Sequence, residues 1–355
     1  MNTPLIFIAF GITGELMKRK IVPALLKLRE RKELPDKFKI IGISRRPADE
    51  MQEMFGEQFC HIQGDATEAD TYTKLKELLE QMESAFNEPA QKIFYISTSP
   101  ALYQIIFEHL AHLAAQSKNP ERMKLMVEKP FGLSGAEAAR LGAVLHRSFN
   151  ESQIYRVDHY LAKESVRYVG VPLKSIKTIE AYFCEMGGVE KRGASYDAVG
   201  ALRDVGQNHL LEMLAVALMP ERLDFLEALA EAHVESTSRA QHTTYREAPG
   251  VAPASQTETH FTCTLLWRGI GVTLAGGKYM PEDRKEVVLT HTDGTITHLP
   301  IVENAGPGEY ERLMLDCVHN KHELFVGERE LGLLWRFIDP IVQNWAQGKP
   351  PLGQY

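Results

Sequence analysis

Hydrophobic runs without alternation mark the first part of the chain. Residues 5–10, 38–44, 92–97 and 123–127 are largely apolar, which is typical of strands buried on both faces of a sheet. Between them, apolar residues recur at helical spacing, most clearly in residues 71–86. Alternating strands and helices predict a parallel sheet with right-handed crossovers.

The pattern changes in the second part of the chain. A strand over residues 176–184 is followed by an apolar helix over residues 210–218, and four shorter strands are expected at residues 261–266, 271–275, 286–290 and 295–301. The Asp293-Gly294 pair between the last two predicts a hairpin turn. Helical patterns follow at residues 309–319 and 329–347, whereas residues 51–64 read as helical and then irregular, and residues 239–256 as a surface loop.

These patterns predict two domains. Residues 1–155 are expected to form a doubly wound, Rossmann-like parallel sheet, which is an α/β fold. Residues 156–355 are expected to form an α+β domain with a mainly antiparallel sheet. A chain of 355 residues is long enough for both.

Composition narrows the class of protein. With 44% hydrophobic and 25% charged residues, the chain can build its own cores. A net charge of −7 argues against a general nucleic-acid or membrane-surface binder. No apolar run reaches the length of a membrane span, and the N-terminus lacks the layout of a signal peptide. The four cysteines form no CxxC pair, so we expect no metal site and a cytoplasmic location.

A glycine turn follows the first strand. The segment GITGELMKRK (11–20) gives the order strand, turn, helix, which presents backbone N–H groups to a pyrophosphate at a helix N-terminus. Gly11 and Gly14 supply two glycines where the usual fingerprint has three, so a purely structural turn is the alternative.

Basic residues stand where the cofactor's ribose is expected. Arg45 and Arg46 end the second strand, where an NAD-binding domain places an acidic residue. Guanidinium groups suit a 2′-phosphate, which favours NADP, with NAD as the weaker choice. A solvated basic loop is the alternative. Lys129 falls at the ligand-binding edge of the sheet, and Tyr103 lies in the first turn of a helix, either near the cofactor or packed.

Acid–base chemistry is concentrated in two segments. IYRVDHYLAKE (154–164) places Asp158 beside a His, a Tyr and a Lys that together suit a phosphate. His209 stands near the start of a helix, close to Asp204 in sequence. A lone helical histidine is more often packed, but its intrinsic pKa of about 6.5 suits a general base, and a carboxylate such as Asp158 would fix its tautomer.

Six motifs in order resemble the glucose-6-phosphate dehydrogenase family. They span nearly the whole chain: GITGELMKRK (11–20), VEKPFG (127–132), IYRVDHYLAKE (154–164), RDVGQNHLLEML (203–214), GGKYMPEDRKEV (276–287) and YERLMLDCVHN (310–320). The resemblance implies an enzyme of the pentose phosphate pathway, in which NADP oxidises glucose 6-phosphate at C1.

The resemblance also implies residue roles. His209 would be the general base and Asp158 would hold it. The 6-phosphate would be bound by His159, Tyr160 and Lys163. Sugar hydroxyls would be held by Glu185 and Asp204, with Lys278 and Arg284 closing the site. Lys129 would touch sugar and cofactor, and the dinucleotide would be lined by Gly11, Ile12, Thr13, Gly14, Glu15, Leu16, Lys18, Arg45, Arg46 and Tyr103.

The chain departs from the family in three ways. It is shorter than typical members, with residues 290–308 compressed and little tail past Trp345, so a second, structural NADP site is not expected. The family dimerises through the antiparallel sheet, which leaves a homodimer or a monomer open here. The segment from Lys278 to Arg284 is one residue longer than the family pattern. A related sugar or amino-sugar phosphate as substrate, and a non-catalytic NADP or sugar-phosphate sensor, are the alternatives.

Overall fold

The computed structural model describes residues 3–355. The chain forms two compact units. Unit 1 contains residues up to Gly132 together with 136–162 and 305–328, and unit 2 contains residues 133–135, 163–304 and 329–355. The expected boundary after residue 155 differs from this division mainly because residues 305–328 belong with the first unit.

Unit 1 is built on a seven-stranded sheet of order β13-β6-β5-β4-β1-β2-β3. All neighbouring strands run parallel except β13, which is antiparallel to β6. Every residue of β1 is buried, as the unbroken apolar run predicts. The strands are β1 (Leu5–Phe10), β2 (Phe38–Ser44), β3 (Phe59–Gln63), β4 (Gln91–Ile96), β5 (Met123–Glu128), β6 (Ile154–Val157) and β13 (Phe325–Val326).

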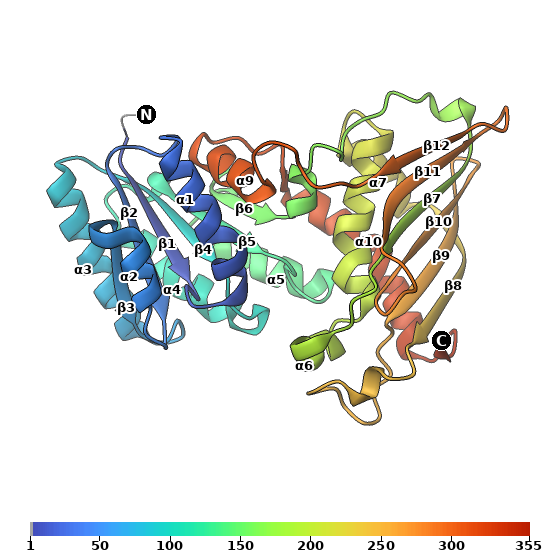
Figure 1. Ribbon diagram of the computed structural model, residues 1–355, viewed down its shortest axis with the longest axis horizontal. Helices are drawn as coiled ribbons and strands as arrows, with labels where there is room; N and C mark the ends of the chain where they lie inside the picture. The colour runs from blue at the N-terminus through green and yellow to red at the C-terminus, as the bar shows by residue number, and fades with distance from the viewer. Residues whose placement is uncertain (1–2) are drawn as a thin grey trace. The chain divides into compact units, whose positions relative to one another are not determined.

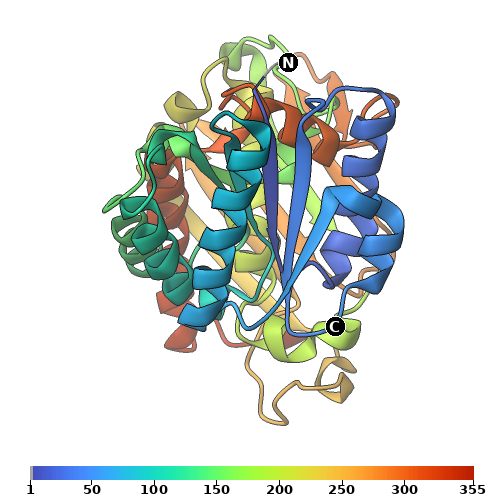
Figure 2. The same cartoon turned by 90° about the vertical axis from the view of Figure 1, so that its left-hand side faces the viewer.

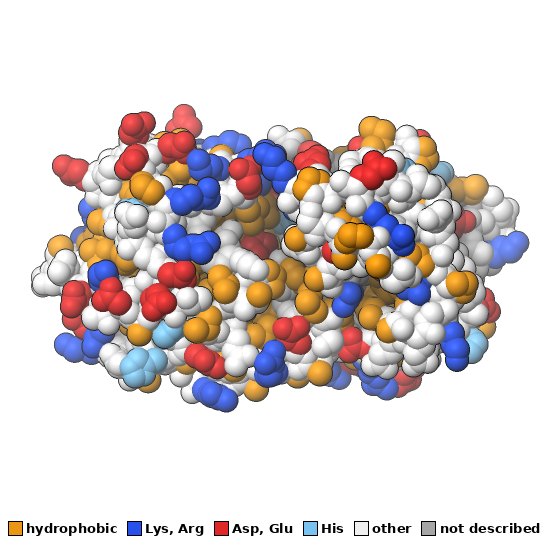
Figure 3. Space-filling view, turned by 90° about the horizontal axis from the view of Figure 1, so that it is seen from below, with side chains coloured by type: hydrophobic (Ala, Val, Ile, Leu, Met, Phe, Trp, Pro, Cys, Tyr) orange, Lys and Arg blue, Asp and Glu red, His pale blue; other side chains and the backbone are white. Residues whose placement is uncertain are grey.

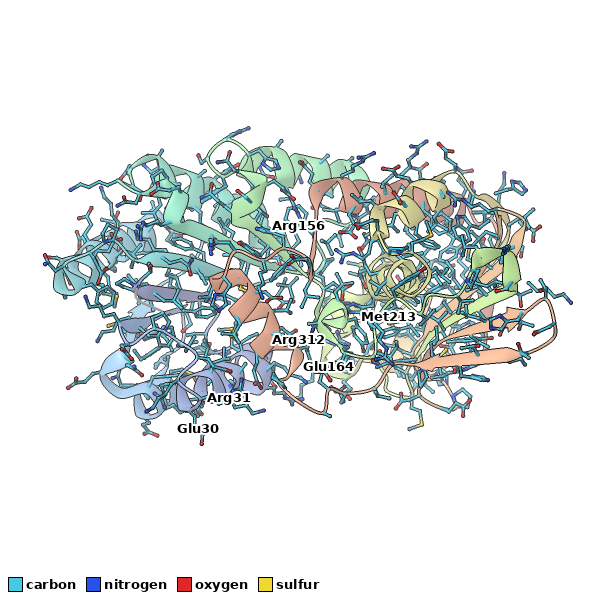
Figure 4. The ribbon with its side chains drawn as sticks, turned by 90° about the horizontal axis from the view of Figure 1, so that it is seen from above. Glu30, Arg31, Arg156, Glu164, Met213 and Arg312 are labelled. Atoms are coloured by element: carbon cyan, nitrogen blue, oxygen red, sulfur yellow. The ribbon has the colours of Figure 1, made fainter. Side chains whose placement is uncertain are left out.

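Helices cover both faces of this sheet (Figure 2). They are α1 (Val22–Glu30), α2 (Asp49–Phe55), α3 (Ala69–Phe86), α4 (Tyr103–Ala115), α5 (Gly135–Leu145) and α9 (Glu309–Val318). The helix α9 packs its apolar side on α1 within one core. Its buried Glu311 forms ion pairs with Lys27 of α1 at 3.2 Å and with Arg31, which follows α1, at 2.7 Å. Arg31 is labelled in Figure 4. These contacts explain why α9 joins unit 1.

Unit 2 contains a second seven-stranded sheet of order β12-β11-β7-β10-β9-β8-β14. Four of its six pairings are antiparallel, and β10 with β7 and β14 with β8 are parallel. Its strands are β7 (Ile176–Cys184), β8 (His233–Gln241), β9 (His260–Trp267), β10 (Ile270–Gly277), β11 (Arg284–His291), β12 (Ile296–Pro300) and β14 (Gly353–Gln354).

Unit 2 has four helices in the part of the chain that the structure describes: α6 (Gly193–Asp197), α7 (Leu211–Leu218), α8 (Arg222–Ala230) and α10 (Glu328–Ala346). Those labelled α7 and α10 in Figure 1 lie beside this sheet. A π-helical segment, η9 (Leu202–Leu210), leads directly into α7. Trp345 of α10 donates a hydrogen bond to Thr237 of β8 at 3.0 Å, and Phe225 of α8 packs against Trp267 of β9.

The fold class predicted from the sequence is confirmed, with three local corrections. Residues 59–63 form a strand where irregular structure was expected, because β3 is an edge strand of only five residues, too short for a clear pattern. The polar strand β8 extends into the expected surface loop as far as Gln241. The helix expected from residue 210 begins earlier, at Leu202. Its first turns were missed because most of their residues are polar.

The described surface gives no sign of a membrane span. No helix within residues 3–355 is long and apolar enough to cross a bilayer. On the face drawn in Figure 3, acidic and basic side chains are intermixed rather than gathered by sign.

Candidate active site

A cavity of about 590 Å³ opens at the carboxyl end of the parallel sheet in unit 1. Its walls come from the turn after β1 and from residues 43–46, 64–67 and 97–99, each of which ends or follows a strand. This is the edge at which doubly wound sheets bind ligands. Asp65, Thr67 and the three serine and threonine residues at 97–99 were not among the expected cofactor residues.

Close packing explains why glycine begins the turn. Gly11 has φ +79°, and a Cβ there would lie 2.6 Å from the carbonyl oxygen of Ser97. Only glycine avoids both penalties. Gly14 donates its N–H to the Gly11 carbonyl at 2.8 Å, which tightens the turn. Both glycines line the cavity, so no side chain covers the backbone of the turn where a pyrophosphate would approach, and the residues present fit a bound dinucleotide.

The two arginines have different settings. Arg46 folds back over the glycine turn and donates to the carbonyl and the hydroxyl of Thr13 at 3.1 and 3.3 Å. The side chain of Arg45 is 81% exposed and lies 3.8 Å from Asp65. A hydrogen bond from the backbone of Thr67, and one from its hydroxyl, lower the pKa of Asp65. Arg46 thus has a fixed guanidinium beside the turn, and Arg45 lies at the open mouth.

Other expected cofactor residues lie outside the cavity wall. The ring of Tyr103 is fully buried against Phe107, and its hydroxyl donates to the Glu128 carbonyl at 2.7 Å. Tyr103 therefore takes the packed alternative. Lys18 pairs with Glu50 at 2.6 Å beside a smaller hollow. Ile12 is buried, Leu16 is partly buried, and Glu15 forms an exposed ion pair with Arg19.

Two candidate residues of unit 1 follow neighbouring parallel strands. Glu128 of β5 is paired with Val157 of β6, so Lys129 and Asp158 leave the sheet at the same edge. Asp158 is 2% exposed, and one of its carboxylate oxygens accepts the N–H of Tyr160 at 3.0 Å. This turn begins η6 (His159–Ala162).

The Asp-His-Tyr segment is braced from both ends. The ring of His159 stacks on Tyr310 of α9 with centroids 5.6 Å apart. Arg312 of the same helix donates to the carbonyl of Ala162 at 2.6 Å. Arg156 of β6 is buried, pairs with Glu151 at 2.6 Å and lies over the ring of Phe131 (Figure 4). The arginine of this motif therefore has a structural role.

Unit 2 holds a second cluster at the ends of two parallel strands. The last residues of β7 and β10, Cys184 and Gly277, are register partners, which places Glu185 beside Lys278. Lys278 is 6% exposed, and its ammonium lies 2.5 Å from Glu185 and 3.8 Å from Asp204. Burial alone would raise the pKa of Glu185, but the ammonium of Lys278 and that of Lys285 lower it below its ordinary value.

The π-helical segment η9 carries both Asp204 and His209. Hydrogen bonds in a π-helix join residues five apart, and such turns are frequent at functional sites. The wide turn brings residues 204 and 209 toward one side of the helix. His209 is 2% exposed, and its ring stacks on Phe183 with centroids 5.5 Å apart. The buried carboxylate of Glu258 accepts the N–H of Leu202 at 3.0 Å and caps the segment.

Strand alternation separates Arg284 from the cluster. Arg284 lies on the face of β11 shared with Tyr182, where it stacks at 3.5 Å from the ring centroid and pairs with Glu286 at 2.6 Å. Lys285 faces the opposite side, lies over Phe183 and contacts Glu185 at 3.0 Å. The structure therefore brings Lys285 to the site in place of the expected Arg284.

Lys163, the last expected phosphate ligand, belongs to unit 2. Its side chain is 4% exposed and lies 2.9 Å from the carboxylate of Glu303. A buried ammonium is the kind of group that binds a phosphate as a point charge.

A nucleotide-binding unit and a unit with clustered lysines, carboxylates and a buried histidine together define a two-domain dehydrogenase of the dinucleotide-dependent kind. Comparison with known proteins identifies the family. The family model described as "Glucose-6-phosphate dehydrogenase, NAD binding domain" matches residues 8–55 and 48–168, and the one for the C-terminal domain matches residues 172–305 and 295–355. The chain belongs to the glucose-6-phosphate dehydrogenase family.

Individual relatives agree. The chain is 27% identical to a glucose-6-phosphate 1-dehydrogenase of Streptococcus pneumoniae over 467 aligned positions, which cover 100% of this chain and 93% of the relative. A crystal structure of the Mycobacterium avium enzyme matches with a TM-score of 0.81, 26% identity and coverage of 100% and 94%. A glucose-6-phosphate dehydrogenase complexed with its substrate matches with a TM-score of 0.84 at 22% identity, covering 100% of this chain and 94% of that one. The alignment with the Streptococcus pneumoniae enzyme spans 467 positions, whereas this chain has 355 residues, which confirms that the chain is a shortened member of the family.

A pH-dependent stability is expected from Glu128. Burial raises the pKa of its carboxyl to about 7, although a hydrogen bond from Tyr95 and the charge of Lys129 oppose the shift. Between about pH 4.5 and 7 the folded protein keeps a proton that the unfolded chain has lost, so stability falls as pH rises.

We expect Glu128→Gln to remove part of this fall, up to about 3 kcal/mol between pH 5 and 7. Urea unfolding at both pH values would measure it, with the exposed Glu53→Gln as a matched control. Equal slopes in the wild type and Glu128→Gln would contradict the assignment.

Proposed function

We propose that this protein oxidises glucose 6-phosphate at C1 to 6-phosphogluconolactone with NADP. The observation that carries the proposal is the cluster of unit 2, in which Lys278 holds Glu185 and lies near Asp204 on the same π-helical segment as His209. A binding module needs fixed polar groups for a sugar, but it has no use for a buried imidazole beside them.

The proposed mechanism separates a proton from a hydride. His209 takes the proton of the C1 hydroxyl through a ring nitrogen while the C1 hydride leaves, so that a C=O bond forms as the C–H bond breaks. NADP held at the glycine turn and the two arginines of unit 1 would supply the hydride acceptor. Asp158 is proposed to receive a hydrogen bond from the other ring nitrogen, which would fix the tautomer and stabilise the imidazolium. This pairing joins the two units and stays a prediction.

Substrate binding is divided between the two ends of the sugar. We assign the 6-phosphate to His159, Tyr160 and Lys163. Glu185 and Asp204 are proposed to accept hydrogen bonds from sugar hydroxyls, with Lys278 and Lys285 keeping Glu185 ionised and fixed. Lys129 is proposed to touch both sugar and cofactor. Because the phosphate is remote from C1, its binding energy can position the reacting carbon.

Location and assembly remain proposals of the same kind. The four cysteines are free, and burial raises the pKa of Cys263 and Cys317 to about 12, so these two thiols are unreactive. Free thiols suit the cytoplasm. A homodimer through the sheet of unit 2 is proposed by family resemblance, and light scattering would distinguish it from a monomer.

The general base gives the most direct prediction. His209→Asn should lower kcat with glucose 6-phosphate and NADP by roughly two to four orders of magnitude, measured by NADPH absorbance. The exposed His233→Asn serves as the control and should stay near wild type. Full activity in His209→Asn would refute the base assignment, and turnover of glucose but not glucose 6-phosphate would refute the phosphate assignment.

Cofactor choice depends on the two arginines. The double change Arg45→Ala with Arg46→Ala removes the guanidinium groups that suit a 2′-phosphate. The KM for NADP should rise about tenfold or more, whereas the KM for NAD should change little. Parallel kinetics with both cofactors would test this, and an equal loss for both would count against a 2′-phosphate contact.

Lys285 and Arg284 lie on opposite faces of β11, so their substitution should have different effects. Lys285→Ala removes one of two ammonium groups from Glu185 and should raise the KM for glucose 6-phosphate several-fold. Arg284→Ala changes the opposite face and should leave KM within about twofold. Steady-state kinetics on the pair would decide, and a larger KM effect from Arg284→Ala would reverse the assignment.

A further inference from the structure

The ion pair between Lys163 and Glu303 is strongly asymmetric. The lysine side chain is 4% exposed, whereas the glutamate side chain is 78% exposed, and the two charged atoms are 2.9 Å apart. A buried ammonium costs free energy unless a counter-charge accompanies it. An exposed carboxylate can supply that charge and can also leave it at little cost, because water solvates it fully.

Glu303 is presented by a short segment, residues 301–304, which we name the strap. The side chain of Asn304 accepts the N–H of Glu164 at 2.8 Å. Val302 and Ser165 exchange two hydrogen bonds, at 3.1 and 3.3 Å. The strap is therefore fastened beside Lys163 by bonds that do not involve the carboxylate of Glu303.

The strap lies where this chain departs from its family. The family's C-terminal domain matches in two segments, residues 172–305 and 295–355, which overlap at residues 295–305, so the chain does not follow the family model continuously there. The helix and strand to either side, α9 and β12, are regular. The shortening therefore places residues next to Lys163 for which the family motifs assign no role.

A sugar phosphate and Glu303 would compete for the same ammonium. A phosphate carries nearly two negative charges and three strong acceptor oxygens at neutral pH, against one charge for a carboxylate. The phosphate is the stronger partner, so it can displace the carboxylate, but part of its binding free energy is lost in doing so.

We propose that Glu303 is a displaceable counter-ion of Lys163, which competes with the substrate's phosphate and thereby sets the KM for the sugar phosphate. The inference rests on the proposed function, since it assigns the phosphate to Lys163. In the free enzyme the carboxylate supplies the counter-charge of the buried ammonium and keeps it in place. In the complex the carboxylate turns into solvent while the strap stays fastened.

The test is Glu303→Gln, compared with Glu164→Gln. Glu164 lies next to Lys163 in the chain and is exposed (Figure 4), so its change alters the local field by the same charge without removing the 2.9 Å pair. Glu303→Gln should lower the KM for glucose 6-phosphate roughly three- to tenfold, with kcat and the KM for NADP within about twofold. Competitive inhibition by inorganic phosphate should strengthen by the same factor.

The outcomes separate this inference from the proposed function. An unchanged or higher KM in Glu303→Gln, or an equal fall in Glu164→Gln, would overturn the counter-ion role while leaving the reaction intact. If the wild type does not oxidise glucose 6-phosphate, the proposed function fails, and calorimetry with inorganic phosphate still tests the pair. Tighter phosphate binding by Glu303→Gln alone would then support the inference, and equal or absent binding in all three proteins would overturn it.

Discussion

A buried ammonium requires counter-charges, and the site in unit 2 depends on that requirement at Lys278. Its partners come from two directions: Glu185 from the end of β7 and Asp204 from η9. The first contact exists because β7 and β10 run parallel within a mainly antiparallel sheet, so that both strands end at the same edge. With the strand direction reversed, residues 185 and 278 would lie at opposite edges. The parallel pairing of β7 and β10 therefore places a carboxylate where the buried ammonium of Lys278 needs one.

The same edge shows how strictly a pleated strand assigns its side chains. Adjacent residues on β11 face opposite sides, so Lys285 reaches Glu185 while Arg284 stacks on Tyr182. One additional residue before the strand is enough to exchange their roles. The family resemblance implied the arginine, although the segment from Lys278 to Arg284 is one residue longer than the family pattern. The alternation of side chains along β11 places the lysine, and not the arginine, beside Glu185.

Much of the fold could be predicted because its signals are local. The apolar run of β1 and the glycine turn after it predicted the nucleotide-binding sheet, and Gly11 has the positive φ that the turn needs. The strand β3 was missed because it is only five residues long, and the start of η9 because most of its residues are polar. Both are held by neighbours distant in sequence. The contact between Glu185 and Lys278 joins residues 93 positions apart, and no spacing rule reveals such a pairing.

The π-helical form of η9 also constrains how this enzyme could evolve. A wide turn accommodates one residue more than a regular helix of the same length, and it is less favourable as a backbone. If the same residues were wound as a regular α-helix, Asp204 and His209, which are five positions apart, would lie about 140° apart around the axis, because each residue turns by about 100°. Such regular winding would give a better helix and a poorer active site. Selection for function must therefore keep an irregularity that selection for stability alone would remove.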